Sequence, residues 1–183
     1  AAGREAAEYT VRGLLSDYYA TSDTWAVPKA IETVLVALNR WLISHAAARR
    51  EMAGMATTLS ALVLRGNRWY SAHVGDSRIY LLRDGALTCL TEDHVWDHPE
   101  MRHVLRRAVG LDAHLVVDHG EGELRPGDIF VLLCDGVWNT LGDERIRATL
   151  EQHADAQECA ADLARSAVQK GAQDNCSAIV LQV

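Results

Sequence analysis

The sequence lacks several features that would direct it to other classes of protein. Its four cysteines, Cys89, Cys134, Cys159 and Cys176, contain no CxxC pair, which argues against a zinc site or a disulfide framework. With 18 Lys and Arg against 25 Asp and Glu, the net charge is -7, whereas nucleic acids and anionic membranes attract clustered basic residues. No apolar run reaches membrane-spanning length and no signal peptide is visible. We therefore expect a cytoplasmic protein with no nucleic-acid or membrane partner.

The length and composition predict one folded domain. The chain has 183 residues, of which 49% are hydrophobic and 23% are charged, so it can bury a core and shows no sign of disorder. It begins with Ala1-Ala2-Gly3-Arg4 and has no initiator methionine. We therefore expect it to be a fragment of a longer protein.

Hydrophobic periodicity predicts helices first, then an antiparallel strand block, then helices and a final strand. The expected helices are 4–20, 28–45, 99–108 and two between 135 and 170, the last of which begins at Asp155 and stops at Lys170-Gly171. The expected strands are 57–64, 69–74, 79–83, 86–90, 114–117, 129–134 and 178–183. This order indicates an α+β architecture.

Three aspartates lie at the ends of apolar, strand-like runs. Asp76 follows the strand that ends at Val74, Asp135 follows the strand 129–134, and Asp174 precedes the strand 178–183. If the last two strands pair antiparallel, the carboxylates of Asp135 and Asp174 lie at the same end of the sheet. Asp76 can reach the same edge.

Carboxylates that lie close together repel each other unless one is protonated or a cation lies between them. No Lys or Arg stands immediately beside Asp135 or Asp174, so a divalent ion with oxygen ligands is the simpler solution. The alternative is that all three aspartates only form turns, because Asp-Gly and Asp-Asn are common turn pairs. Taken one at a time they favour the turn, and taken together with their flanking residues they favour the metal.

The same residues, in the same order, resemble the metal-dependent PP2C-type (PPM) serine/threonine protein phosphatases of bacteria. Asp135 matches the aspartate of the family's Ser-Asp-Gly motif, Asp174 that of its Asp-Asn motif, and Asp76 that of its Gly-Asp-Ser-Arg motif. Further matches are Gly54-Met55-Ala56-Thr57-Thr58, Leu90-Thr91-Glu92-Asp93-His94, Arg107-Ala108-Val109-Gly110 and Gly127-Asp128-Ile129. Cys134 stands where the family usually has Ser, and Ala56 where it often has Gly.

The resemblance implies a four-layer α/β/β/α sandwich of two antiparallel sheets flanked by helices. It implies that Asp135 and Asp174 are the catalytic ligands of a binuclear Mn²⁺ or Mg²⁺ centre, and that Asp76 helps to hold a third, weaker ion. The implied function is hydrolysis of phosphoserine and phosphothreonine in proteins by a metal-activated water, without a covalent intermediate. The expected protein is thus a bacterial signalling hydrolase.

Several upstream elements of that family do not occur in the sequence: a phosphate-binding Arg, an Asn-Glu-Asp segment and an Asp-Gly-x-Gly-Gly loop. The segment 3–7 matches the start of the helix that follows this loop. We therefore expect residues 1–183 to be a single PP2C-like phosphatase domain that lacks its N-terminal strands and is incomplete or inactive by itself. The alternative is a pseudophosphatase that binds phosphoproteins or a kinase without turnover.

The expected partners are phosphoprotein substrates and a serine/threonine protein kinase. The stretch Trp96-Asp97-His98 is similar to phosphatase domains that are fused to a kinase domain in one bacterial polypeptide. His94 and His98 have a spacing that can bind metal on a helix, but Pro99 favours a polar loop. We expect Arg78 to be an ion-pair partner and Trp138 to pack in the core.

Overall fold

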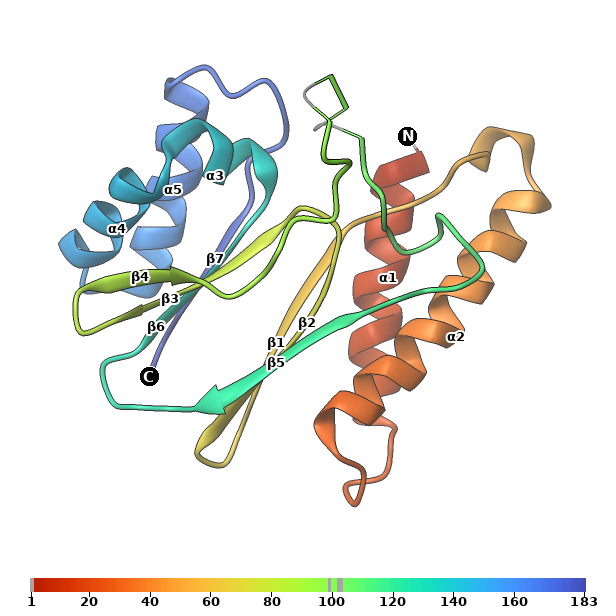
Figure 1. Ribbon diagram of the computed structural model, residues 1–183, viewed down its shortest axis with the longest axis horizontal. Helices are drawn as coiled ribbons and strands as arrows, with labels where there is room; N and C mark the ends of the chain where they lie inside the picture. The colour runs from red at the N-terminus through yellow and green to blue at the C-terminus, as the bar shows by residue number, and fades with distance from the viewer. Residues whose placement is uncertain (1, 99, 102–103) are drawn as a thin grey trace. The chain divides into compact units, whose positions relative to one another are not determined.

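The computed structural model describes residues 2–98, 100–101 and 104–183. The chain divides into two compact units, which are labelled by their elements in Figure 1. The first unit contains Ala1–Gly75 and His94–Gly122, and the second contains Asp76–Asp93 and Glu123–Val183.

The first unit is a helical pair against a sheet. Its elements are α1 (Ala2–Tyr19), α2 (Val27–Ala47), the 3-10 turn η1 (Arg50–Met52), β1 (Leu59–Arg65), β2 (Arg68–Val74) and β5 (Asp118–Glu123). The sheet order is β1-β2-β5, and β1 pairs antiparallel with β2. The apolar stripe of α2, which includes Ile31, Leu35 and Leu42, is buried in one core with Ala72 and Val74 of β2. This arrangement is what the helical periodicity of α2 requires.

The second unit is a four-stranded sheet covered by helices. Its elements are β3 (Arg78–Arg83), β4 (Ala86–Cys89), β6 (Ile129–Leu133), α3 (Asp135–Leu141), α4 (Asp143–Gln152), α5 (Ala156–Gln169) and β7 (Ala178–Gln182). The strand order is β4-β3-β6-β7, with every neighbouring pair antiparallel. Val131 and Leu133 of β6 share a buried core with Val137 of α3 and Leu163 of α5. The apolar side of the sheet is therefore closed by the three helices.

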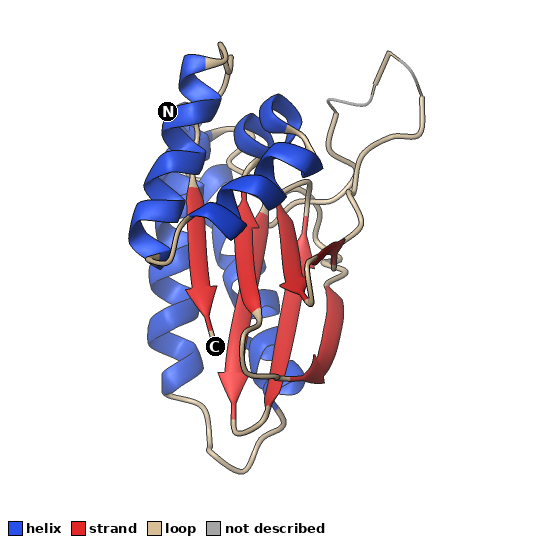
Figure 2. Cartoon of the chain, turned by 90° about the vertical axis from the view of Figure 1, so that its left-hand side faces the viewer, coloured by secondary structure: helices blue, strands red, loops and turns tan. Residues whose placement is uncertain are grey.

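The predicted α+β class, with two antiparallel sheets flanked by helices, is confirmed (Figure 2). Most predicted elements are also present, with ends that differ by a few residues. Between residues 135 and 170, however, the structure has three helices, α3, α4 and α5, where two were predicted. None of the helices in the described ranges is both long and apolar enough to cross a membrane.

The predicted helix over 99–108 is wrong where the structure describes it. Residues 104–108 are not helical, and Val95 forms an isolated antiparallel bridge with Leu105. The peptide N–H of Arg106 donates to the carbonyl of His94 at 2.7 Å, so the backbone is satisfied by the facing chain. Val104 is 36% exposed, and its apolar character therefore does not mark a buried helical face. Residues 99, 102 and 103 of that prediction lie outside the described residues.

The strand predicted at 114–117 is also displaced, because the observed strand is β5. Its sequence, Asp-His-Gly-Glu-Gly-Glu, carries no apolar alternation. A Cβ at Gly122 would lie 2.7 Å from Nε1 of Trp69, so the ring of Trp69 occupies the space where a side chain of this strand would stand. The ring of Trp69 on β2 thus takes the place of the apolar side chains that would normally identify β5 as a strand.

The N-terminus of α5 provides a test of the local fold. Asp155 caps this helix, since its carboxylate accepts from the peptide N–H of Glu158 at 2.8 Å. Replacing Asp155 by Ala should lower the free energy of unfolding by about 1 kcal/mol, whereas Asp155→Ser should retain most of it. Urea denaturation would measure both values. Equal stability of the Ala variant and the unmodified chain would contradict the cap.

Candidate functional site

The structure brings the strands that lead to Asp135 and Asp174 together. β6 and β7 are antiparallel neighbours, and Leu133 at the end of β6 pairs with Ala178 at the start of β7. Asp135 is the first residue of α3, two positions after Leu133, and Asp174 lies four positions before Ala178. The predicted antiparallel pairing is therefore confirmed. The role of the two carboxylates as metal ligands stays a prediction.

The segment that carries Asp174 is held by Cys134. The peptide N–H of Ser177 donates to the Cys134 sulfur at 3.0 Å, and the thiol donates to the Asn175 carbonyl at 3.0 Å. The Cys134 peptide N–H also donates to the Ser177 carbonyl at 3.2 Å. A Cβ at Gly136 would overlap the Asn175 carbonyl oxygen. Glycine is thus required at position 136 for the close contact between these two chain segments.

The carboxylates of the second unit interact electrostatically. Burial, followed by the negative charge of Asp135, raises the pKa of Asp76 from 3.8 to about 6, with smaller contributions from Asp93 and Asp174. One oxygen of Asp135 accepts from the Gly136 peptide N–H at 2.8 Å, and one of Asp174 accepts from the Asn175 peptide N–H at 2.7 Å. Among the described residues, no three His, Cys, Asp or Glu side chains are gathered closely enough to form a metal cluster. The negative charges of Asp76, Asp135 and Asp174 thus influence one another, but the three carboxylates do not by themselves form a complete set of metal ligands.

Arg78 is an ion-pair partner, as predicted. Its guanidinium binds Asp93 with two parallel hydrogen bonds, from Nε to Oδ1 at 2.9 Å and from Nη2 to Oδ2 at 2.8 Å. Nη1 donates to the Tyr80 hydroxyl at 3.0 Å. The bonds to Asp93 raise the pKa of Arg78 despite partial burial. This cation is therefore neutralised by Asp93.

His94 has a structural role in the first unit, which the sequence did not reveal. It is 2% exposed, its Nδ1 accepts from the Gly75 peptide N–H at 3.1 Å, and its own peptide N–H donates to the Gly75 carbonyl at 2.7 Å. Its Nε2 lies 2.9 Å from Asp118, which also accepts from Arg107. Burial works to raise the pKa of Asp118, but His94 and Arg107 outweigh it and lower the pKa. His94 thus fixes the backbone of Gly75, the residue before Asp76.

His94 and His98 do not form a metal-binding pair on a helix. Residues 94–98 are not helical, and His98 is exposed while His94 is buried. The loop interpretation favoured by Pro99 agrees with this backbone, although Pro99 itself is not among the described residues.

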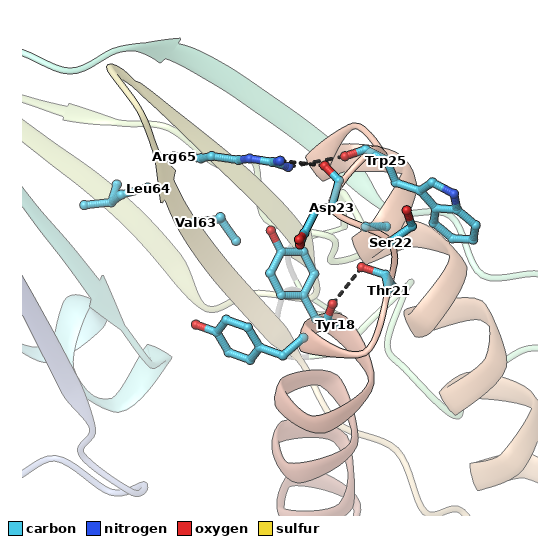
Figure 3. A pocket seen from close by; sticks show the side chains of 10 residues that line it. Tyr18, Thr21, Ser22, Asp23, Trp25, Val63, Leu64 and Arg65 are labelled. Carbon is cyan, nitrogen blue, oxygen red and sulfur yellow. Dashed lines mark hydrogen bonds between the residues drawn. The ribbon is translucent and has the colours of Figure 1, made fainter.

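A hollow of about 250 Å³ lies elsewhere in the first unit, beside the turn between α1 and α2 (Figure 3). Arg65 of β1 donates to the main-chain carbonyls of Asp23 at 2.7 Å and Trp25 at 3.3 Å. Its guanidinium thereby ties the turn to the sheet. The lining includes Tyr18 and Val63 but none of the three candidate aspartates.

Comparisons with known proteins identify the family of the chain. Residues 2–176 match the family described as protein phosphatase 2C. The serine/threonine protein phosphatase PstP of Mycobacterium tuberculosis (strain ATCC 25618 / H37Rv) is 33% identical in an alignment of length 149 that covers 73% of this chain and 28% of PstP. The serine/threonine phosphatase stp of Listeria monocytogenes (strain EGD-e) is 28% identical in an alignment of length 200, gaps included, that covers 99% of this chain and 79% of stp.

A solved structure extends the likeness to three dimensions. The catalytic domain of PstP in complex with two manganese ions superposes with a TM-score of 0.86 at 30% identity, covering 98% of this chain and 80% of that one. The fold is thus that of the PP2C-type phosphatases. The chain belongs to the protein phosphatase 2C family. It spans only 28% of the length of the PstP sequence that it matches.

The raised pKa of Asp76 predicts a dependence of stability on pH. Because the folded chain holds a proton that an unfolded aspartate has lost, the free energy of unfolding of the metal-free protein should fall between about pH 4 and pH 6. Asp76→Asn should remove this fall and stabilise the protein at pH 7 by about 1 kcal/mol, allowing for solvent screening.

Urea denaturation in a chelator at several pH values would measure this effect. Asp17→Asn, an exposed position in α1, is the matched control and should leave the profile unchanged. A profile that Asp76→Asn does not alter would show that burial and the neighbouring carboxylates do not raise the pKa of Asp76.

Proposed function

We propose that this chain is part of a phosphatase that hydrolyses phosphoserine and phosphothreonine in proteins with the help of Mn²⁺ or Mg²⁺. The observation that carries the proposal is the placement of Asp135 and Asp174 at the paired ends of β6 and β7 in a member of the protein phosphatase 2C family. The manganese ions of the PstP structure support the choice of metal.

The residues present fit such ions. Carboxylate oxygens are the ligands that Mn²⁺ and Mg²⁺ prefer, and Asp135 and Asp174 each keep an oxygen beyond the one that accepts a peptide N–H. Burial and the neighbouring carboxylates raise the pKa of Asp76, and a cation would relieve this repulsion. We propose that Asp135 and Asp174 hold a binuclear centre and that Asp76 helps to hold a third, weaker ion.

The ions would supply a water that is deprotonated near neutral pH and would neutralise charge on the phosphoryl oxygens. The chain's own contribution is orientation. Asp135 and Asp174 would bind the ions through their carboxylates and transfer no proton. Cys134 fixes the segment that carries Asp174 through its hydrogen bonds to Asn175 and Ser177. The thiol is a hydrogen-bonding group in this mechanism, and the nucleophile is water.

We further propose that residues 1–183 form one phosphatase domain that upstream residues complete. The superposition with the PstP catalytic domain covers 98% of this chain and 80% of that domain. The proposed partners are phosphoproteins and a serine/threonine kinase, separate or in the same polypeptide, and the proposed location is the cytoplasm. A phosphoprotein-binding module without turnover is the alternative.

A chain extended by its native upstream segment should hydrolyse a phosphothreonine peptide in the presence of Mn²⁺ and lose this activity with a chelator. Asp135→Asn and Asp174→Asn should each lower kcat/KM by about 100-fold or more, because each removes a charge that holds an ion while leaving side-chain volume unchanged. Peptide hydrolysis would be followed by release of inorganic phosphate.

Cys134→Ser is the matched control for this experiment. It keeps a donor and an acceptor between Asn175 and Ser177, and it should therefore leave activity nearly intact. An extended chain that is inert with metal would favour the binding module. Loss of activity in Cys134→Ser with full activity in Asp174→Asn would point to a thiol mechanism instead.

The chain of 183 residues by itself should bind Mn²⁺ or Mg²⁺ only weakly. It offers two strong carboxylate ligands and one weaker one, so waters must complete each coordination shell. Calorimetric titration should accordingly give a dissociation constant in the range of about 0.1 mM or above. Tight binding would mean that these residues form a more complete site than proposed.

A further inference from the structure

Trp138 links the helix of one candidate ligand to the backbone of another. It lies on α3, three residues after Asp135, so the two side chains share one side of the helix. Its indole Nε1–H donates to the main-chain carbonyl of Asp76 at 2.9 Å. All three residues belong to the second unit. The backbone of Asp76 is therefore tied to the helix that Asp135 begins.

The indole ring of Trp138 is fixed on its face as well as at its edge. The guanidinium carbon of Arg78 lies 3.4 Å from the ring centroid, which is close cation–π contact. Arg78 is itself fixed by its double hydrogen bond to Asp93 and its bond to the Tyr80 hydroxyl. The ring can therefore not rotate its N–H away from Asp76 without losing the contact with Arg78.

We propose that Trp138 is a positioning residue of the metal centre, which orients Asp76 toward the ions through its hydrogen bond to the Asp76 carbonyl. This inference rests on the proposed function, because Asp76 has a ligand to orient only if the chain binds metal. Groups that hold a ligand in place typically change metal affinity by about 10- to 100-fold when they are removed.

The geometry requires tryptophan in particular. A phenylalanine at this position would keep an aromatic face for Arg78 but would have no donor for the Asp76 carbonyl. Trp138 packs against the core of the second unit, as predicted, but it is only partly buried, so core packing engages only part of its side chain. The Trp138→Phe variant thus removes the N–H donor and preserves most of the ring packing.

The first test observes the hydrogen bond directly in the unmodified chain. The protein has five tryptophans, and the indole N–H signal that disappears in Trp138→Phe identifies Trp138 in a nitrogen-15 NMR spectrum. We expect this N–H to exchange with solvent at least about 10-fold more slowly than a free indole, because opening the bond must precede exchange. Exchange at the free rate would overturn the proposal, even if Trp138→Phe fails to fold.

The second test asks whether Trp138 acts through Asp76. Free Mn²⁺ measured by electron paramagnetic resonance gives the affinity of the unmodified chain, Trp138→Phe, Asp76→Asn and the double variant. Trp138→Phe should weaken Mn²⁺ binding by about 10-fold in the unmodified chain and by less than about 2-fold in the Asp76→Asn background, since coupled residues are not additive. A merely structural role would weaken binding equally in both backgrounds and would overturn the proposal.

Trp41→Phe is the matched control. Trp41 is 42% exposed on α2 in the first unit, and its replacement should leave Mn²⁺ affinity unchanged. Absence of Mn²⁺ binding by the unmodified chain, up to 10 mM as an order-of-magnitude ceiling for a weak site, would contradict the proposed metal centre. Mn²⁺ binding that Trp138→Phe does not alter would contradict the role of Trp138 alone.

Discussion

The antiparallel pairing of β6 with β7 is the constraint on which the candidate site depends. It brings a strand that ends before Asp135 beside a strand that begins after Asp174, although the two residues are far apart in the sequence. The two crossing segments then approach so closely that Gly136 has no room for a Cβ against Asn175. The rigid edge of the sheet thus fixes candidate ligands from distant parts of the chain, which a single loop could not do.

Placing carboxylates together has an electrostatic cost that the surrounding residues do not remove. Arg78 is close at hand, but its guanidinium is used by Asp93 and by the face of Trp138. The charge near Asp76 is therefore left for a cation to balance, which agrees with its raised pKa. A site for hard metal ions is in this sense a locally unfavourable arrangement that becomes favourable when the ion binds.

The sequence predicted the elements whose physical cause is local. The apolar stripe of α2, the apolar run of β6 and the Asp155 cap of α5 each depend on nearby residues and are where they were expected. β5 could not be found in this way, because the ring of Trp69 on another strand supplies its apolar contact. The helix expected over 99–108 failed for the converse reason. Met101 and Val104 of its expected apolar face are exposed, and an apolar spacing whose side chains are not buried together does not make a helix.

The candidate site was predictable in its ligands and not in the groups that hold them. An aspartate at a strand end is visible in a sequence, whereas the bond of Trp138 to the Asp76 carbonyl joins residues 62 positions apart, and the bond of His94 to Gly75 joins residues 19 apart. The role of Cys134 could not be predicted from the sequence either, because a thiol in place of a hydroxyl looks like a departure from the family motif. Its sulfur still accepts from Ser177 and donates to Asn175, so the feature that is kept is a hydrogen-bonding geometry and the residue type can change.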